Sequence, residues 1–504
     1  MKRTCFMGID IGTYESKGVI MDDAGHVIAF RSCPHIMESP QPGYAEHDAD
    51  QVWWHDFCLL SKELIQVSGI DPADIKAVGC STIAPCCLPV DDHGAPLRKA
   101  ILYGVDVRAS AEIRDLEALF GKEQIFESCG MPITSQSVAA KILWIRNHEP
   151  DIYRNTARFI TGSTYLVAKL TGEYVIDRYT AASWVPLYDL ETNNWSDARI
   201  DVFCRPDQLA ACRWTNELAG TVTAEASRQT GLMAGTPVSV GTADAAAEAI
   251  SAGVYEPGDL LLMYGSSIFM IHVTEKLTAD RRLWTGPYLF PETTVVSAGM
   301  STAGTLTRWF RDWLAQDLLE VERATGMNAY DLLAKESQAI PPGSEGLIVL
   351  PYFSGERTPI NDPQAKGVFF GLNLCHTRAH LFNACLEGVG YGIAQHFDIF
   401  DAMQIGTKKV MAVGGGVKNP KWLQIVSDIS GKIQHTVQEG AGAAFGDALL
   451  AALSVGFFTD VREIGRLIHI DQTILPDDQV RQLYQAYKRR YTALYQATAD
   501  IMHE

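Results

Sequence analysis

The chain has 504 residues, of which 47% are hydrophobic and 20% charged, and its formal net charge is −18. This length accommodates two large domains, and the ordinary composition argues against a disordered scaffold. Because the chain is acidic and has no run of basic residues, we do not expect a nucleic-acid-binding surface.

The cysteines and the N-terminus bear on the cellular compartment. The 11 cysteines are scattered singly apart from the pair Cys86-Cys87, and no CxxC motif occurs. This spacing gives poor support for zinc or dithiol chemistry and favours reduced thiols. The first apolar run stops at Asp10, too short for a signal peptide, and no run approaches the roughly 18 residues of a membrane span. We therefore expect a cytoplasmic protein.

An acid interrupts the first predicted strand, residues 5–11, which is otherwise apolar. Gly12-Thr13 turns the chain, and Lys17 precedes the return strand of a predicted β-meander. A buried Asp10 is costly unless it is paired or coordinates a cation. Asp10 could cap the Gly12 turn, but Thr13 and Lys17 suit a phosphate and favour a metal-linked role.

Two charges follow a short strand that is predicted at residues 101–103. Asp106 and Arg108 come soon after it, and on sequence alone a surface ion pair is the better interpretation. A helix is predicted from Gln136 to His148.

The stretch at residues 239–267 combines two features near the middle of the chain. Asp244 lies at a corner between an apolar strand and an alanine-rich helix, where a side chain can face a cleft. A second apolar strand, residues 260–264, ends in Gly265-Ser266-Ser267, whose small residues let backbone N–H groups approach a phosphate. Asp244 could instead be the N-cap of the helix. A proton acceptor and a phosphate cradle together suggest phosphoryl transfer between two lobes.

Two helices and one glycine run are predicted in the second half of the chain. Residues 301–314 are predicted to be helical, with Trp309, Phe310 and Trp313 as core, and a longer helix spans residues 377–401.

The strand at residues 409–413 leads into Gly414-Gly415-Gly416, and Asn419 then opens a helix with the residues typical of a helix start. A glycine run between strand and helix lets a ring or a sugar lie against the backbone.

The order of these elements repeats along the chain. A strand ending at Gly12-Thr13 recurs as one ending at Gly265-Ser266, and a strand ending at Gly79 recurs as one ending at Gly414. Two halves of similar design, each with a phosphate hairpin, would form a cleft.

These segments resemble motifs of the FGGY family of carbohydrate kinases, within the actin, hexokinase and heat-shock ATPase superfamily. The resemblance covers nearly the whole chain. Two departures from the family signatures occur, at the residues before Lys141 and at Cys385. The segments that carry the resemblance are residues 8–17, 42–46, 53–54, 141–148, 367–387 and 414–428, together with the glycine-alanine run that begins at Ala441.

The resemblance implies an α/β protein with two ribonuclease-H-like domains, of the actin-like ATPase type, flanking a catalytic cleft. It implies an N-terminal domain at residues 1–253, with the sugar site, the first phosphate hairpin and the catalytic Asp. A C-terminal domain at residues 254–504 would hold the second phosphate hairpin and the adenine site. The implied cofactors are ATP and Mg²⁺, and the implied partner is a small sugar or polyol rather than a nucleic acid or a membrane. A homodimer is possible, since the family often dimerises.

Motif positions also imply the role of single residues. Asp244 matches the catalytic base, and Asp10 would hold Mg²⁺ through water. The phosphate-binding residues would be Gly12, Thr13, Lys17, Gly265, Ser266 and Ser267. The nucleotide-binding residues would be Gly304, Gly414, Gly415, Gly416 and Asn419. The residues that face the acceptor would be Ala84, Pro85, Tyr103, Asp106, Gln136, Asp244 and Phe269.

The chemistry suits these residues. A sugar hydroxyl is a poor nucleophile, and a carboxylate within hydrogen-bond reach can take its proton as the bond to phosphorus forms. Positioning and charge neutralisation supply the rest of the catalysis.

The acceptor site is where the match weakens. The segment 83–86 replaces the Gln-Met-His-Gly of xylulokinases and also lacks the Arg-Glu pair of glycerol kinases, and Ala245 replaces a common Asn or Gln. Fewer fixed hydrogen bonds imply a different sugar or weaker discrimination. We expect ATP-dependent phosphorylation of a ketose such as xylulose. A ribulokinase, a linear polyol kinase and a kinase of a signalling molecule remain open, as does a non-catalytic, sugar-sensing ATP-binding regulator.

Overall fold

The computed structural model describes residues 3–438 and 442–504 of an α/β protein. Contacts divide these residues into two compact units. Unit 1 takes those within residues 1–256, 273–295 and 439–468, and unit 2 takes those within residues 257–272, 296–438 and 469–504. Each unit is therefore assembled from segments that are far apart in the sequence.

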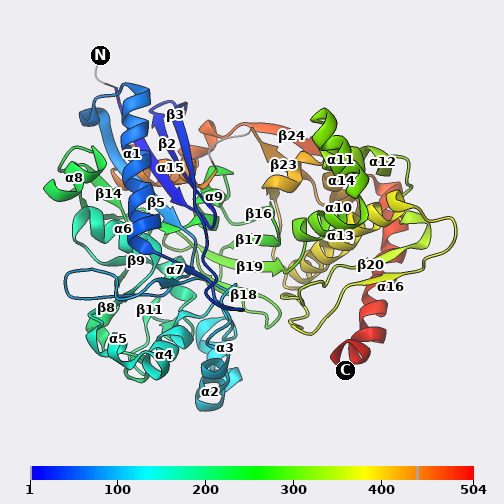
Figure 1. The fold of residues 1–504 in the computed structure, drawn as a ribbon, viewed down its shortest axis with the longest axis horizontal. Coiled ribbons are helices and arrows are strands. Elements are labelled where there is room, and N and C mark those ends of the chain that lie inside the picture. Colours follow the sequence, from blue (N-terminus) through cyan, green and yellow to red (C-terminus); the bar gives the residue numbers. More distant parts are fainter. Residues whose placement is uncertain (1–2, 439–441) are drawn as a thin grey trace. The chain divides into compact units, whose positions relative to one another are not determined.

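Unit 1 is built on a mixed sheet in which β1 lies between the antiparallel β2 and the parallel β5 (Figure 1). The strand order is β13-β14-β5-β1-β2-β3, and β15 pairs with the end of β5. The strands are β1 (Cys5–Ile11), β2 (Glu15–Asp22), β3 (Val27–Pro34), β5 (Ile75–Thr82), β13 (Leu218–Thr221), β14 (Pro237–Ser239) and β15 (Thr242–Ala243).

Helices and short strand pairs complete unit 1. The helices are α1 (His55–Ser68), α2 (Ser110–Phe120), α3 (Lys122–Cys129), α4 (Val138–His148), α5 (Pro150–Asn155), α6 (Gly162–Thr171), α7 (Arg178–Ala182), α8 (Ala224–Thr230), α9 (Asp244–Ser251) and α15 (Ala443–Ser454). The short strands are β4 (Glu46–His47), β6 (Leu88–Val90), β7 (Ala100–Ile101), β8 (Arg158–Ile160), β9 (Val175–Asp177), β10 (Tyr188–Asp189), β11 (Asn194–Trp195), β12 (Ala211–Arg213) and β18 (Trp284–Pro287). Short helical turns lie at Ala49–Trp54, Pro72–Asp74, Ile200–Val202, Pro206–Gln208 and Val461–Leu467.

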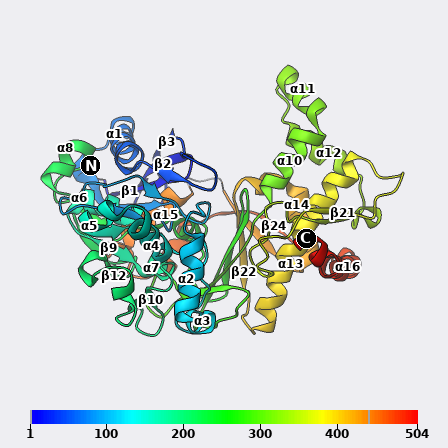
Figure 2. The ribbon, with the colours of Figure 1, turned by 60° about the horizontal axis from the view of Figure 1, so that its bottom comes forward.

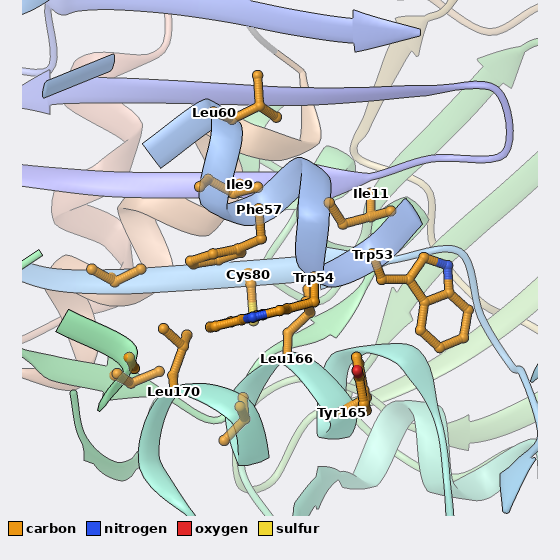
Figure 3. Packing of buried hydrophobic residues seen from close by; sticks show 14 of the residues in the cluster. Ile9, Ile11, Trp53, Trp54, Phe57, Leu60, Cys80, Tyr165, Leu166 and Leu170 are labelled. Carbon is orange, nitrogen blue, oxygen red and sulfur yellow. The ribbon is translucent and has the colours of Figure 1, made fainter. Parts of the chain in front are cut away.

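Helix α1 covers one face of this sheet. Ile9 and Gly18 face each other across β1 and β2, and a methyl group on Gly18 would lie 2.8 Å from Leu64 of α1. The absence of a side chain at Gly18 therefore lets α1 approach the strand. Trp54 stacks on Phe57 with ring centroids 5.7 Å apart, within the core that Figure 3 shows.

Helix α15 covers the opposite face. Gly8 and Gly79 are neighbours across β1 and β5. Because successive residues of a strand point to opposite faces, both lie on the face of the sheet opposite to Ile9. A methyl group on Gly8 would lie 2.0 Å from the carbonyl oxygen of Ala444, and one on Gly79 would lie 2.2 Å from that of Asp447. Backbone atoms cannot yield as side chains do, so this approach requires glycine at both positions.

Unit 2 repeats the strand plan of unit 1. In its sheet β16 lies between the antiparallel β17 and the parallel β22, within the order β18-β19-β17-β16-β22-β23-β24. The strands are β16 (Asp259–Tyr264), β17 (Ile268–Thr274), β19 (Thr294–Met300), β22 (Lys409–Val413), β23 (Gln434–Val437) and β24 (Ile470–Ile474), with a separate hairpin of β20 (Ile348–Leu350) and β21 (Val368–Phe370).

A long helix, α13, forms the centre of unit 2 (Figure 2, yellow). Apolar residues at helical spacing predicted this helix, and most of its side chains are buried. The helices of this unit are α10 (Gly304–Leu314), α11 (Gln316–Thr325), α12 (Ala329–Ser337), α13 (Arg378–Ala402), α14 (Pro420–Ser430) and α16 (Asp478–His503), with short helical turns at Ser344–Gly346 and Gly415–Lys418.

Three predictions about these elements were wrong. Strand β5 continues past Gly79 to Thr82, because β1 stays paired with it as far as Ile11. Trp313 is not a core residue: its side chain is 68% exposed. Asp106 and Arg108 form an ion pair that is buried rather than on the surface.

A helix that crosses a membrane needs about 20 predominantly apolar residues. Within residues 3–438 and 442–504, no helix combines the length and the apolar character that a transmembrane helix needs.

Candidate active site

Four acidic side chains converge near the ends of β1 and β5 in unit 1. Asp10 is on β1, Asp244 and Glu248 are on α9, and Asp447 is on α15. All four raise one another's pKa or share a hydrogen-bond partner. The strand ends, the start of α9 and the close packing of α15 therefore bring together acids that are far apart in the sequence.

Ser81 connects two of these acids. It lies beside Asp10 in the parallel register of β1 and β5. Its Oγ is 2.7 Å from Oδ2 of Asp447 and 3.1 Å from Oδ1 of Asp10. A hydroxyl has one proton to donate, so these two carboxylates cannot both be satisfied by Ser81 when both are ionised.

Burial dominates the electrostatics of the cluster. It raises the pKa of Asp10 well above the usual range, and the charge of Asp244 adds to that rise. Burial also raises the pKa of Asp244 to about 7, and the nearby Glu248 contributes to the shift. The pKa of Glu248 is raised by its own burial, while Lys17 opposes the rise. The cluster is therefore short of positive charge.

A hydrated divalent cation fits this deficit. Within residues 3–438 and 442–504, Oδ1 of Asp447 is buried and has no hydrogen-bond partner, and the pKa of its carboxyl is raised by burial and by the charge of Asp10. Carboxylate and hydroxyl oxygens are the donors that Mg²⁺ prefers, and it keeps several of its waters. Asp10, Ser81 and Asp447 are thus suited to hold Mg²⁺.

Asp244 is the first residue of α9, and the N-cap position belongs to Ala243. Its Oδ1 accepts a hydrogen bond of 2.8 Å from the amide of Ala245. Its charge also raises the pKa values of Tyr103 and Cys86, so those side chains lie within its electrostatic reach. The Ala245 amide therefore holds one oxygen of this carboxylate.

The turn between β1 and β2 is held in one conformation. The Gly12 amide donates to the Glu15 carbonyl at 3.1 Å. Thr13 Oγ1 lies 3.3 Å from the Tyr103 hydroxyl, and the Thr13 carbonyl is 3.2 Å from Nε2 of His47. Lys17 pairs with Glu15 at 3.4 Å, with both side chains partly exposed. The structure thus brings together Thr13 and Tyr103, which were predicted for different roles.

The turn between β16 and β17 in unit 2 is fixed by the start of α10. The Gly265 amide donates to the Ser267 carbonyl, and the amides of Ala303 and Thr305 both donate to the Ser266 carbonyl, each at 3.0 Å. A methyl group on Gly304 would lie 2.6 Å from the Gly265 carbonyl oxygen. The structure therefore gives Gly304 a packing role against this turn.

The glycines after β22 differ in whether a side chain would fit at each position. Gly414 has a φ of +92°, and a methyl group there would lie 2.7 Å from the Tyr264 carbonyl oxygen. A methyl group on Gly416 would collide with Tyr264 and Trp422, whereas one on Gly415 would meet nothing within 4 Å. Asn419 caps α14 by accepting from the Trp422 amide at 3.2 Å.

Asp106 has no carboxylate oxygen left free for a ligand. Arg108 donates to both of its oxygens, and the Ala45 amide donates to Oδ2 at 2.7 Å. Arg108 also reaches Glu46 at 2.8 Å. The two oxygens are thus taken by a buried ion-pair network, which sequence reasoning placed on the surface.

The other predicted acceptor residues lie on loops and on β17. Ala84 is half-buried and Pro85 is buried. Gln136 packs on Gly104, where a methyl group would lie 2.7 Å from its side chain. Phe269 is on β17 in unit 2, whereas the remaining acceptor residues are in unit 1.

Sequence reasoning missed two of the four acids, Glu248 and Asp447, and also Ser81, whose hydroxyl connects Asp447 to Asp10. Glu248 lies four residues after Asp244 and so shares a face of α9 with it. Asp447 is the one acid in an otherwise apolar helical segment, residues 443–453. A charge inside an apolar helix is costly without a partner, and that signal could have found it.

Known proteins resemble the chain along its whole length. The N-terminal domain model of the FGGY family of carbohydrate kinases matches residues 5–251, and the C-terminal domain model of the same family matches residues 260–455. Xylulose kinase of Escherichia coli (strain K12) is 30% identical over 502 residues, which cover 99% of this chain and 100% of that protein.

Two further similarities concern another kinase and a solved structure. Autoinducer-2 kinase of Escherichia coli (strain K12) is 29% identical, over 97% of this chain and 94% of that protein. The crystal structure of xylulose kinase from Rhodospirillum rubrum superimposes with a TM-score of 0.91 at 30% identity, covering 99% of this chain and 100% of that one. The expected actin-like ATPase fold with two sheet-containing domains is thereby confirmed. The chain belongs to the FGGY family of carbohydrate kinases and is a phosphotransferase with an alcohol group as acceptor.

Proposed function

We propose that this kinase transfers the γ-phosphoryl group of ATP to a hydroxyl of a ketose such as xylulose. The family membership and the similarity to xylulose kinases support ATP use and a sugar acceptor. The single observation that carries the proposal for this chain is the half-buried carboxyl of Asp244 at the start of α9, with its pKa raised to about 7.

A pKa near neutrality suits a general base. A carboxylate with an ordinary pKa near 4 is a weak base, whereas one near 7 takes a proton more readily and is still ionised in part at neutral pH. Asp244 therefore takes the proton of the acceptor hydroxyl as the bond to phosphorus forms. The hydrogen bond from Ala245 orients the carboxylate for this step.

We propose that Mg²⁺ is the second cofactor and that Asp10, Ser81 and Asp447 hold it, in part through water. Bound Mg²⁺ would neutralise charge on the transferring phosphoryl group. The unpartnered Oδ1 of Asp447 and the shared Ser81 hydroxyl support this placement. Gly12, Thr13 and Lys17 in one turn, and Gly265, Ser266 and Ser267 in the other, would bind phosphate oxygens.

The adenine side and the domain boundary complete the proposal. Gly415 has open space beside its backbone, so the run from Gly414 to Gly416 can accept a flat ring, with Asn419 fixing the helix behind it. We propose Gly304 as a further nucleotide-binding residue, next to the second phosphate turn, through its contact with Gly265. A functional boundary after residue 253 fits the family-model matches, which leave residues 252–259 between them.

For the acceptor, Ala84, Pro85, Tyr103, Gln136 and Phe269 would shape the site. Asp106 would act through its ion pair rather than by direct contact, because Arg108 and Ala45 occupy its oxygens. A kinase of a signalling molecule is the second candidate, since autoinducer-2 kinase of Escherichia coli is 29% identical to the chain.

We also propose a cytoplasmic homodimer. The free state of the cysteines supports a reducing compartment. Exposed apolar side chains in unit 2, among them Phe370, Leu372 and Leu374, support self-association. A molecular mass of one chain in sedimentation experiments would contradict the dimer.

A panel of ketoses, polyols, sugar acids and autoinducer-2 tests the function. ADP release is measured by a coupled assay, and mass spectrometry identifies the phosphorylated product. We expect the highest kcat/KM with a ketose. Phosphorylation confined to autoinducer-2 would select the second candidate, and ADP release with no phosphorylated product from any compound would contradict both.

A further inference from the structure

Three potential metal ligands meet in unit 2, outside the proposed catalytic cluster. Glu345 lies in the turn before β20, and Cys375 and His376 lie just before α13. One ligand atom from each of these residues lies within 4.8 Å of the other two. All three come from segments of the same unit, so their arrangement is internal to it.

The spacing matches a small tetrahedral ion. Cys375 Sγ is 3.5 Å from Oε2 of Glu345. Around Zn²⁺, a thiolate at about 2.3 Å and a carboxylate oxygen at about 2.0 Å lie roughly 3.5 Å apart. The thiol and the carboxylate are therefore already at the separation that a shared cation requires.

His376 supplies the third ligand. Within residues 3–438 and 442–504, its Nε2 is buried and has no hydrogen-bond partner, although the Asn373 amide donates to its Nδ1 at 3.0 Å. A cation on Nε2 moves the ring proton to Nδ1, and a cation on Nδ1 displaces the amide. Either arrangement gives up the hydrogen bond from the Asn373 amide. Binding through Nε2 gives that buried nitrogen a partner, whereas binding through Nδ1 replaces the amide by the cation.

His380 is an outer partner of the Glu345 carboxylate. Its Nδ1 accepts from the Thr377 amide at 3.2 Å, so the ring proton is on Nε2, which faces Oε2 of Glu345 at 3.5 Å. Carboxylates that bind metals commonly have such an outer partner, which fixes their direction.

The Glu345 backbone is held in an uncommon conformation. Ser344 and Glu345 both have positive φ values, 44° and 53°. Buried Glu387 of α13 fixes this turn by accepting from the Gly343 amide and from the Ser344 hydroxyl, each at 2.8 Å. Consecutive non-glycine residues in this region are costly, and such outliers occur often at ligand sites.

We propose that Glu345, Cys375 and His376 bind one divalent transition-metal ion, Zn²⁺ in the first place, with water as the fourth ligand. The thiolate selects such an ion over Mg²⁺, which prefers oxygen. Binding releases the Cys375 thiol proton, which the structure places against Oδ1 of Asn373 at 2.8 Å. The ion links the turn at residues 343–346 to the start of α13. The cysteine spacing alone argued against zinc, because only one of these ligands is a cysteine.

Cobalt substitution tests the site in the full-length protein. The metal-stripped protein is titrated with Co²⁺ in the absence of nucleotide, and the thiolate-to-cobalt charge-transfer absorption is recorded. We expect this absorption to saturate at one Co²⁺ per chain and to be lost on adding Zn²⁺. Cys375→Ser should abolish it, and His376→Gln should weaken Zn²⁺ binding at least tenfold in competition titrations.

Matched variants separate this site from others. Cys58→Ser removes another cysteine and should leave the absorption unchanged, and Asp10→Asn should do the same because the proposed Mg²⁺ site has no thiolate. Absence of the absorption in the unmodified protein, or its persistence in Cys375→Ser, would overturn the proposal.

Alkylation of the unmodified protein gives an independent readout. Zn²⁺ should slow iodoacetamide labelling of the exposed Cys375 at least tenfold, as mapped by peptide mass spectrometry, whereas Mg²⁺ should not. Equal labelling rates with and without Zn²⁺ would also overturn the proposal.

Discussion

The two large sheets share a strand plan but differ in the residues at one corresponding position. In unit 1, the residue two places before the turn glycine is Asp10, which pairs with Lys17 on β2 and with Ser81 on β5. In unit 2, the residue two places before Gly265 is Met263, which pairs with Phe269 on β17 and with Val413 on β22.

This difference shows how one architecture serves two purposes. The charged and hydroxyl-bearing set in unit 1 can hold a cation, whereas the apolar set in unit 2 can only pack. The four acids on β1, α9 and α15 that raise one another's pKa or share Ser81 all belong to unit 1. Unit 2 keeps the backbone turn, with its small residues and serine hydroxyls, without the acid.

The largest expected effect is on Asp244, the acid at the start of α9 in unit 1. Asp244→Asn should lower kcat by about 10³-fold, since general-base catalysis typically contributes 10²–10⁴-fold. ATP binding, measured by calorimetry, should change little. A variant that keeps a tenth or more of the turnover would exclude Asp244 as the base.

Substitutions at the two corresponding positions, Asp10 and Met263, test the comparison directly. Asp10→Asn should lower kcat by about 10²-fold and raise the Mg²⁺ concentration that gives half-maximal rate, because an amide oxygen holds the cation less well than a carboxylate. Met263→Leu is the matched change in unit 2 and should cost less than about 1.5 kcal/mol of stability with no effect on Mg²⁺ dependence. If both variants shift the Mg²⁺ dependence equally, the assignment of the cation to unit 1 is wrong.

Glycine positions provide a second contrast between the units. Gly8→Ala places a methyl group 2.0 Å from the Ala444 carbonyl oxygen, whereas Gly415→Ala meets nothing within 4 Å. We expect Gly8→Ala to lower the free energy of unfolding by about 3 kcal/mol through overpacking, and Gly415→Ala to leave it within about 0.5 kcal/mol. Urea unfolding measures both, and equal midpoints would contradict the close approach of α15.

The pH dependence distinguishes two acids that have similar pKa values, the half-buried Asp244 and the buried Glu387. The pKa is raised to about 7 both for Asp244 in unit 1 and for Glu387 in unit 2, in each case chiefly by burial. Because the folded-state pKa lies above the unfolded one, each group contributes stability that is present below about pH 4 and is lost as the pH rises through 7.

Only Asp244 should affect the rate. The rate with the unmodified protein should fall as the pH drops below 7, because the base becomes protonated. Asp244→Asn should be more stable than the unmodified protein at pH 8, by about 2 kcal/mol, and similar to it at pH 4. Thermal unfolding at the two pH values checks this, and an equal difference at both would argue against the raised pKa.

Much of this contrast could be predicted from the sequence. Apolar strands followed by Gly-Thr and Gly-Ser predicted both turns, and the position of Asp244 at the start of α9 followed from the alanine-rich segment after it. These signals are local: they depend on strand and helix patterns over fewer than about a dozen residues.

What could not be predicted depends on contacts between distant segments. Trp313 follows the apolar spacing of α10, but its side chain is exposed. The spacing of apolar residues within a helix does not show whether another element covers that face. Asp106 and Arg108 became a buried pair because Glu46 and Ala45 pack against them from another loop. The lone acid in the apolar segment 443–453 indicates that Asp447 needs a partner, but the identity of that partner depends on α15 packing on β1 and β5, which no local pattern records.

The return of α15 to the first sheet affects how the protein is made. Ser81 and Asp447, which share a hydrogen bond, are 366 residues apart. During translation, β1 and β5 emerge long before the helix that covers them, so the ribosome-bound chain exposes that apolar face until nearly all of it has been synthesised. Chaperone dependence and truncation sensitivity should therefore be greatest for the part of the molecule that is made first.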